Sequence, residues 1–148
     1  MDATVTLSDR FVRIVESRMK NTLEGIENTV NSILENHEIT LEDLEKIMQG
    51  LEESFTLLSQ KWNLQILFIL FLRNTVGFSQ LKKILEVNSR TLSDKLKNLT
   101  SQGHVKRIVE KGPPLRVRYS LTQRGRNTVL LALPLLYYSR TNRREYIQ

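Results

Sequence analysis

The chain has 148 residues, 40% of them hydrophobic, with 22 Lys or Arg against 16 Asp or Glu and a formal net charge of +6. This length suits about one domain, and the hydrophobic content supports a globular core, which excludes a disordered tail. The apolar runs at 66–72 and 129–138 are far shorter than the roughly 20 residues of a membrane span, and no secretion signal is recognised. We therefore expect a cytoplasmic protein without a membrane segment.

The first third of the chain predicts two long helices. From Asp9 to about Glu35, apolar residues recur at helical spacing without an internal proline. Thr40, with Asp43 three residues later, predicts the cap of a second helix. Apolar residues of this second helix step alternately by three and four, which suits a coiled-coil-like seam: Leu41, Leu44, Met48, Leu51, Phe55 and Leu58. The seam fits either a second subunit or a helical hairpin within one subunit, and the pattern leaves both open.

The middle of the chain predicts two further helices. Residues 61–73 are apolar nearly all round, as in a helix buried on most sides, and Asn74 to Gly77 break it. Ser79 is a predicted N-cap for a short helix over residues 80–85. This helix directs three apolar residues to the core and two lysines outward: Leu81, Ile84 and Leu85, and Lys82 and Lys83. Val87 and Asn88 then make a turn into the next helix, so the two helices form a helix-turn-helix pair.

A basic amphipathic helix follows over about Ser89 to Ser101, with Ser89 as its predicted N-cap. Leu92, Leu96 and Leu99 stack on one face, which must be buried. The opposite face carries a polar, mostly basic stripe made of Arg90, Ser93, Asp94, Lys97 and Ser101. A DNA major groove can receive such a stripe, although a solvated helix face has the same pattern.

Gly103 ends the basic helix, and a basic β-hairpin is predicted from about Val105 to Leu121. The second strand has two alternating faces. Its solvent-facing residues are Arg116, Arg118 and Ser120, and its packed residues are Leu115, Val117, Tyr119 and Leu121. Gly112, Pro113 and Pro114 form the tip, where the prolines prevent further strand pairing and stiffen the loop. Basic residues on a projecting loop can reach phosphates or a minor groove.

The last predicted helix begins after Thr122, its expected N-cap, and runs from Gln123 to Tyr138 with a kink or restart at Pro134. Its dense apolar run must be covered by other protein. We interpret Arg140 to Gln148 as a solvated basic end, with auxiliary DNA contact as the alternative.

Charge separates the two parts of the chain. Residues 1–60 hold five Lys or Arg and twelve Asp or Glu, a net of −7, whereas residues 61–148 hold seventeen and four, a net of +13. So basic a stretch predicts salt-dependent binding to a polyanion, since each neutralised phosphate releases counterions. The acidic part is expected to face away from DNA and to hold subunits together or to meet another protein.

Several separated motifs of residues 60–126 resemble the HxlR-type winged-helix transcriptional regulators, relatives of the MarR group. The motifs are Lys61-Trp62 with Ile66-Leu67, Phe78 to Lys82, Ser89 to Leu99, Gly103 to Val105, and Arg118 to Thr122 with Gly125. The resemblance implies a homodimeric DNA-binding regulator that places the basic helix in the major groove and uses the hairpin as a wing. It also implies that the C-terminal helix joins an N-terminal helix in the dimer interface.

The chain departs from that family at two points. Members commonly carry a cysteine just before the Lys-Trp pair, but this chain has none, which excludes a thiol sensor. About 58 residues precede Ser59 to Trp62, where the family usually has a brief extension.

We therefore expect a mainly α-helical fold with a small β-hairpin wing: a winged helix-turn-helix with long N-terminal helices and a C-terminal dimerisation helix. The expected parts are an N-terminal helical extension (1–58), a DNA-binding domain (59–126), and a C-terminal helix with a basic tail (127–148). The expected function is sequence-specific regulation of transcription by a homodimer on double-stranded DNA, as a repressor, without a cofactor or metal; a small-molecule effector is left open. The candidate DNA-binding residues are Ser79, Gln80, Lys82, Ser89, Arg90, Thr91, Ser93, Asp94, Lys97, Lys111, Arg116 and Arg118.

Two other function classes are alternatives to a specific regulator. A low-specificity DNA-coating or architectural protein can use the same fold, and the ratio of specific to random DNA affinity separates the two. An enzyme is disfavoured, because His37 and His104 are far apart in the chain and no glycine-rich phosphate loop or paired acid and base is recognised.

Overall fold

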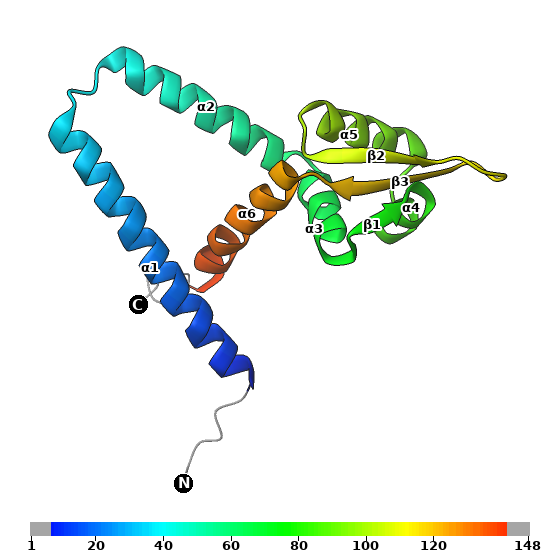
Figure 1. Ribbon diagram of the computed structural model, residues 1–148, viewed down its shortest axis with the longest axis horizontal. Helices are drawn as coiled ribbons and strands as arrows, with labels where there is room; N and C mark the ends of the chain where they lie inside the picture. Colours follow the sequence, from blue (N-terminus) through cyan, green and yellow to red (C-terminus); the bar gives the residue numbers. More distant parts are fainter. Residues whose placement is uncertain (1–6, 142–148) are drawn as a thin grey trace, which may run out of the picture. The chain divides into compact units, whose positions relative to one another are not determined.

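The computed structural model describes residues 7–141, so most of the predicted basic tail lies outside the described residues. The helices and strands, in chain order, are α1 (Leu7–Asn36), α2 (Leu41–Ser59), α3 (Asn63–Arg73), β1 (Thr75–Gly77), α4 (Phe78–Leu85), α5 (Ser89–Ser101), β2 (Val105–Glu110), β3 (Arg116–Leu121) and α6 (Gln123–Thr141) (Figure 1). The chain divides into two compact units, residues 1–50 and residues 51–148.

The unit of residues 1–50 contains α1 and the first part of α2, as the apolar periodicity predicted. The predicted cap of α2 is present: the backbone N–H of Asp43 donates to Thr40 Oγ1 at 3.2 Å, and Thr40 N donates back to Asp43 Oδ2 at 3.2 Å. Hydrogen bonds from the Thr40 side chain and backbone hold the pKa of Asp43 below its ordinary value. The apolar residues of both helices remain largely exposed, and Leu23, Ile26, Leu44 and Met48 each keep about half of their surface accessible.

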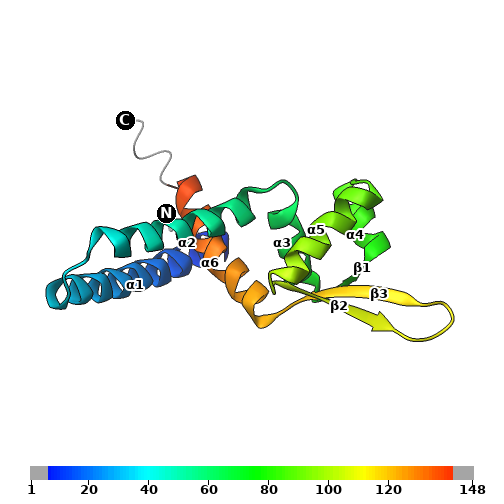
Figure 2. The ribbon, with the colours of Figure 1, turned by 90° about the horizontal axis from the view of Figure 1, so that it is seen from above.

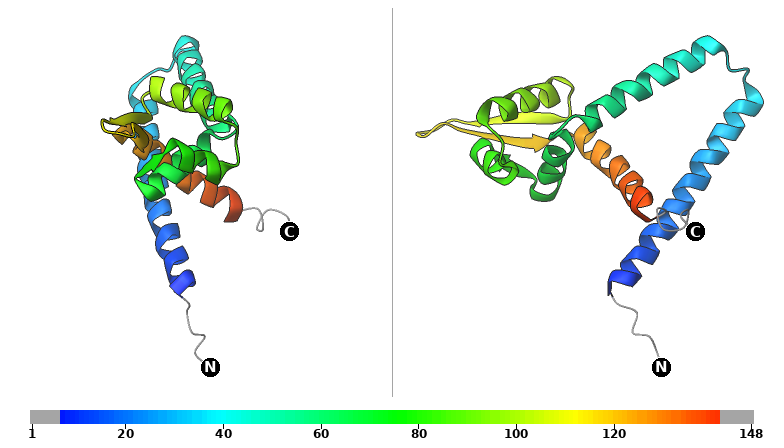
Figure 3. Two further views of the ribbon diagram at one scale, coloured as in Figure 1. Left: turned by 90° about the vertical axis from the view of Figure 1, so that its right-hand side faces the viewer. Right: turned by 180° about the vertical axis from the view of Figure 1, so that it is seen from behind.

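The unit of residues 51–148 is a winged helix-turn-helix. Helices α3, α4 and α5 pack around one core, whose fully buried side chains include Ile66, Leu67, Leu81, Leu92 and Leu99. The sheet lies beside these helices, and the β2–β3 hairpin extends past them to a projecting tip (Figures 2 and 3). Burial of each such side chain stabilises the fold by about 1.5–3 kcal/mol, so the leucine face of α5 is fixed inward.

The sheet has three antiparallel strands in the order β1-β3-β2. The hairpin matches the prediction and pairs Val105 with Leu121 at its base and Glu110 with Arg116 near its tip. The strand β1 was missed, because Thr75–Gly77 were interpreted as a helix break; they pair with Arg118–Ser120 of β3. Three residues that end in a glycine carry no alternation that sequence reasoning can detect, and only the neighbouring strand makes them β structure.

Two predicted helix caps were wrong by one or two positions. Helix α4 begins at Phe78, and the N–H of Gly77 donates to Gln80 Oε1 at 3.2 Å, so Ser79 lies inside the helix. Helix α5 is capped by Asn88, whose Oδ1 accepts a hydrogen bond from Thr91 N at 2.8 Å, and Ser89 is its first residue. Asn and Ser cap equally well, so the sequence alone did not choose between neighbours.

Three predictions of burial were also wrong. Ser120, expected on the solvent-facing side of the second strand with Arg116 and Arg118, is buried; it lies in the central strand, paired with Thr75 and Lys106. Leu115, expected on the packed face, is 66% exposed because it lies beyond the end of β3. Ile84, expected in the core, is 42% exposed, while Leu81 and Leu85 of the same helix are buried.

Helix α6 begins where predicted, with the N–H of Gly125 donating to Thr122 Oγ1 at 3.0 Å, and it continues through Pro134. Val129 and Ala132 are buried, but Leu130, Leu131, Leu133 and Leu135 remain exposed. The single chain thus covers one side of this apolar helix. Among the described residues, no single helix is long and apolar enough to cross a membrane; α2 and α3 reach that length and composition only together, across a 75° bend.

Candidate nucleic-acid interface

The polar stripe of α5 is accessible, whereas its leucine face is not. Arg90, Asp94 and Lys97 are exposed, and Thr91 and Ser93 are half-buried. Leu92, Leu96 and Leu99, on the opposite face, are at most 2% exposed. The one lysine of α5 outside the stripe, Lys95, is half-buried and donates to Gln60 Oε1 at 3.4 Å. Three charged side chains of α5 are therefore free to meet a ligand while the helix stays anchored.

The candidate residues of α4 lie in its first two turns. Ser79, Gln80 and Lys82 are all exposed. The Gln80 side chain already accepts the hydrogen bond from Gly77 N, so it serves the start of the helix. Exposed Ser79 and Lys82 leave this end of the helix-turn-helix pair polar and basic, which suits contact with phosphates.

The hairpin has one basic face. Arg116 and Arg118 lie on the same face as Lys106 of the neighbouring strand, because residues two apart in a strand share a face and Lys106 pairs with Ser120. Lys106 was not among the predicted site residues; the strand register, which the sequence did not specify, assigns it to this face. Lys111 and Arg116 are exposed near the tip. The carboxylate of Glu110 lies 3.7 Å from Arg118 Nη1. Glu110 therefore competes with a DNA phosphate for contact with Arg118.

A network of backbone contacts fixes the hairpin to α5 and α6. His104, in the turn after α5, donates from its backbone N–H to Leu99 O at 2.9 Å and accepts from Thr122 N at 3.0 Å. Thr122 Oγ1 donates to Gly103 O at 2.5 Å. The turn itself depends on Gly103, which has φ +78°, a left-handed conformation that a side chain disfavours. Together these bonds determine where the hairpin leaves the basic helix.

His104 has a structural role in this turn, and its side chain is buried. Its Nδ1 has no hydrogen-bond partner among the described residues. Burial lowers the pKa of His104 below its ordinary value of 6.5, and the positive charge of Arg124 lowers it further. Both effects favour the neutral form of the imidazole. Within the described part of the chain, no group of three His, Asp or Glu side chains is arranged to hold a metal ion.

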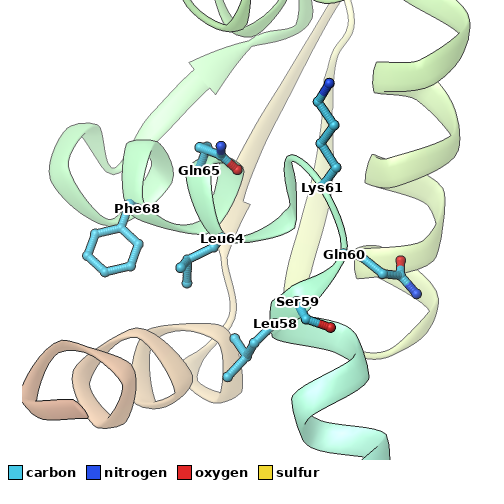
Figure 4. Close-up of a pocket in the computed structure, with 7 residues that line it drawn as sticks. All are labelled: Leu58, Ser59, Gln60, Lys61, Leu64, Gln65 and Phe68. Atoms are coloured by element: carbon cyan, nitrogen blue, oxygen red, sulfur yellow. The ribbon is translucent and has the colours of Figure 1, made fainter. Parts of the chain in front are cut away.

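An open pocket of about 470 Å³ lies where α2 ends and α3 begins. Leu58, Leu64 and Phe68 point to one side of it, toward α6, while Gln60 and Lys61 point away from them (Figure 4). Lys61 Nζ instead lies 4.9 Å from the ring centre of Trp62. The polar and apolar groups therefore do not converge on one bound molecule.

Comparison with known proteins agrees with this geometry. The profile of the HxlR-like helix-turn-helix family matches residues 57–143. The HTH-type transcriptional regulator YvaP of Bacillus subtilis is 38% identical over 76 residues, which are 51% of this chain and 69% of that protein. The regulator YdzF of the same organism is 34% identical over 77 residues, which are 51% of this chain and 71% of that protein.

Solved structures show the same fold. A transcriptional regulator of the MarR family from Enterococcus faecalis V583 superimposes with a TM-score of 0.63 at 24% identity, covering 68% of this chain and 91% of that chain. The redox regulator HypR in its reduced form gives a TM-score of 0.57 at 25% identity, covering 64% and 93%. The matched relatives are regulators of transcription and not enzymes. From the family match and the two sequence relatives, the chain belongs to the HxlR-like helix-turn-helix family and is a transcriptional regulator with a DNA-binding fold.

Proposed function

We propose that the protein is a homodimeric repressor that binds a specific operator, with α5 in the major groove and the β2–β3 hairpin as a wing on the backbone or in the minor groove. One observation carries the proposal. Arg90, Asp94 and Lys97 of α5 are exposed while its leucines are buried, so the accessible face of the second helix of the pair is the one with groups that can read base edges.

The homodimer part of the proposal is supported by α6. Its exposed leucines form an apolar surface that needs cover, and HxlR-like regulators of this type often act as dimers. A two-fold dimer presents two copies of α5 to half-sites about one helical turn, roughly 34 Å, apart. The operator is accordingly expected to be a palindrome.

The proposal predicts different effects for the two basic surfaces. Arg90→Ala or Lys97→Ala removes a contact to base edges and should relax sequence preference at one operator position, at a cost of about 1–3 kcal/mol. Arg116→Ala or Arg118→Ala removes a phosphate contact and should weaken binding to all sequences alike, with a smaller salt slope.

The experiment is selection of bound fragments from genomic DNA, followed by affinity measurements on the best fragment and on random duplex. Lys46→Ala, which removes one exposed positive charge from the unit of residues 1–50, is the matched control and should change neither quantity. A preference of about a thousandfold for the selected fragment supports a specific regulator. A ratio near one contradicts it and favours the architectural role, and a reporter gene that loses expression when the protein is removed contradicts repression.

A further inference from the structure

Helix α1 has an apolar face with an internal symmetry. Val12 and Ile33 lie ten and a half positions on either side of the midpoint between Thr22 and Leu23. Val15 and Val30 are related by the same midpoint, and so are Met19 and Ile26. At 100° per residue, all of these side chains lie within about 50° of one direction around the helix. The apolar positions therefore coincide with one another when the helix is reversed end to end about this midpoint.

This face is uncovered in the single chain. Leu23, Ile26, Val30 and Ile33 are each 47–56% exposed, and Val12, Val15 and Met19 are half-buried. Helix α1 spans 30 residues and lies wholly outside the region that matches the HxlR-like family, residues 57–143. Its apolar face is therefore not explained by the DNA-binding fold.

The charge of α1 is divided between its two halves. Residues 7–20 hold four basic and two acidic side chains, whereas residues 21–36 hold three glutamates and no Lys or Arg. Parallel pairing of two copies of α1 sets the acidic half of one copy along the acidic half of the other, which is unfavourable. Antiparallel pairing sets the basic half of each copy beside the acidic half of the other.

Charge also argues against the alternative in which α1 folds back along α2 of the same chain. Such a hairpin places the acidic half of α1 beside the first turns of α2, which carry Glu42, Asp43 and Glu45. Two segments of like charge would then lie on neighbouring helices. A second copy of α1 in the reverse direction offers both the matching apolar face and the opposite charge.

From these observations we propose that α1 pairs with α1 of a second copy of this chain, in antiparallel orientation, about a two-fold axis that passes between Thr22 and Leu23. In this pairing Met19 of one copy meets Ile26 of the other, Val15 meets Val30, and Val12 meets Ile33. The inference deepens the proposed homodimer and rests on that proposal for the presence of a second copy. It adds an interaction surface that the family match does not cover.

Cysteine cross-linking tests the proposal sharply, because the chain has no cysteine and each introduced thiol is unique. In the full-length protein, Leu23→Cys lies beside its own copy and should form a disulfide dimer in most of the sample on mild oxidation. Val12→Cys and Ile33→Cys lie about 32 Å from their own copies, since a helix rises 1.5 Å per residue, and should not cross-link alone. A mixture of Val12→Cys and Ile33→Cys proteins should cross-link after exchange of subunits.

A second variant pair checks that the apolar face holds the copies together. In the Leu23→Cys background, Ile26→Asp places a charge in the seam and should lower the cross-linked fraction severalfold. Asn28→Asp adds the same charge on the opposite side of α1 and should leave the fraction unchanged.

Other results overturn the inference. Cross-linking of Val12→Cys and Ile33→Cys each with itself indicates parallel pairing, and no cross-linking at any position indicates that something other than a second α1 covers this face. Operator binding by the reduced variants reports separately on the proposed function. If the variants bind the operator but do not cross-link, the pairing of α1 is wrong and the proposed function is retained. If they cross-link but do not bind DNA, α1 pairs as proposed and the proposed function is wrong.

Discussion

Gly125, near the start of α6, lies against the backbone of the turn that precedes β2. A Cβ atom at this position would lie 2.0 Å from His104 O, closer than any non-bonded contact permits. The neighbouring atom belongs to the backbone, which is held by the hydrogen bond from Thr122 N, so it has no freedom to withdraw. The residue at 125 is thus set by packing, although a helix interior ordinarily disfavours glycine.

Gly125→Ala is expected to destabilise the protein by about 1–3 kcal/mol, the usual cost of overpacking, instead of giving the gain that alanine brings in a helix. Chemical denaturation of the full-length protein measures the change. Gly25→Ala is the matched control, because nothing lies within 4 Å of the added Cβ in α1, and it should not destabilise. Equal stability of the two variants would contradict the close contact at His104.

His104 should make stability depend on pH. Its pKa in the folded protein is lowered by burial and then by Arg124, so the unfolded chain binds the proton more tightly. The stability from the neutral imidazole is fully present above the unfolded pKa of 6.5 and is lost as the pH falls through the lower folded value.

Urea denaturation at about pH 7.5 and about pH 5 measures this loss. His104→Gln should lose less stability between the two pH values than the parent protein does. His37→Gln, altered at an exposed histidine, serves as the control for removing an imidazole and should follow the parent. Parallel pH curves for His104→Gln and the parent would mean that the buried imidazole does not titrate with folding.

At the scale of elements, the N-terminus of α5 is where the sequence and the structure name different capping residues. Asn88→Ala removes the acceptor for Thr91 N and should destabilise the protein by about 1 kcal/mol. Ser89→Ala, at the position that the sequence suggested, should leave the free energy of unfolding nearly unchanged because Ser89 is already the first helical residue. The two melting curves decide the question, and a larger loss at Ser89 would favour the sequence-based assignment.

The elements also differ in how far the sequence predicted them. Long periodic segments such as α1, α2 and α5 were predicted with nearly the observed bounds, because an apolar repeat over several turns specifies a helix locally. The strand β1 was missed and the burial of Ser120 was not predicted, because both depend on how β3 packs with segments far away in the chain. Pairing between distant segments leaves no local signal.

At the scale of the whole molecule, the two predicted binding surfaces should respond differently to salt. Contact of the basic residues with phosphates weakens as counterions compete, so six to ten such contacts predict a loss of about 10³–10⁵ in DNA affinity between roughly 50 and 200 mM salt. Pairing through apolar faces of α1 and α6 is not screened in this way. Fluorescence anisotropy with labelled operator and light scattering on the free protein measure the two quantities in the same buffers. A fall in dimer mass that tracks the fall in DNA affinity would indicate that charge, not apolar burial, joins the subunits.

The candidate site was predicted from the sequence to an unequal extent. The stripe of α5 could be predicted because helical spacing alone opposes Arg90 and Lys97 to Leu92 and Leu96. The place of Lys106 beside Arg118, and the ion pair of Arg118 with Glu110, could not be, since both follow from the register of two strands. The domain boundaries suggested at residues 58 and 126 stay a proposal.

The sequence by itself determined the order of the helices, the β-hairpin, the division of charge and the membership of a family, because periodicity, turn residues and motifs are carried by neighbours in the chain. The tertiary structure decided which glycine cannot be replaced, which lysine joins the wing, and which apolar faces remain uncovered. Each of these depends on contacts between segments far apart in the chain, and such contacts exist only after the chain has folded.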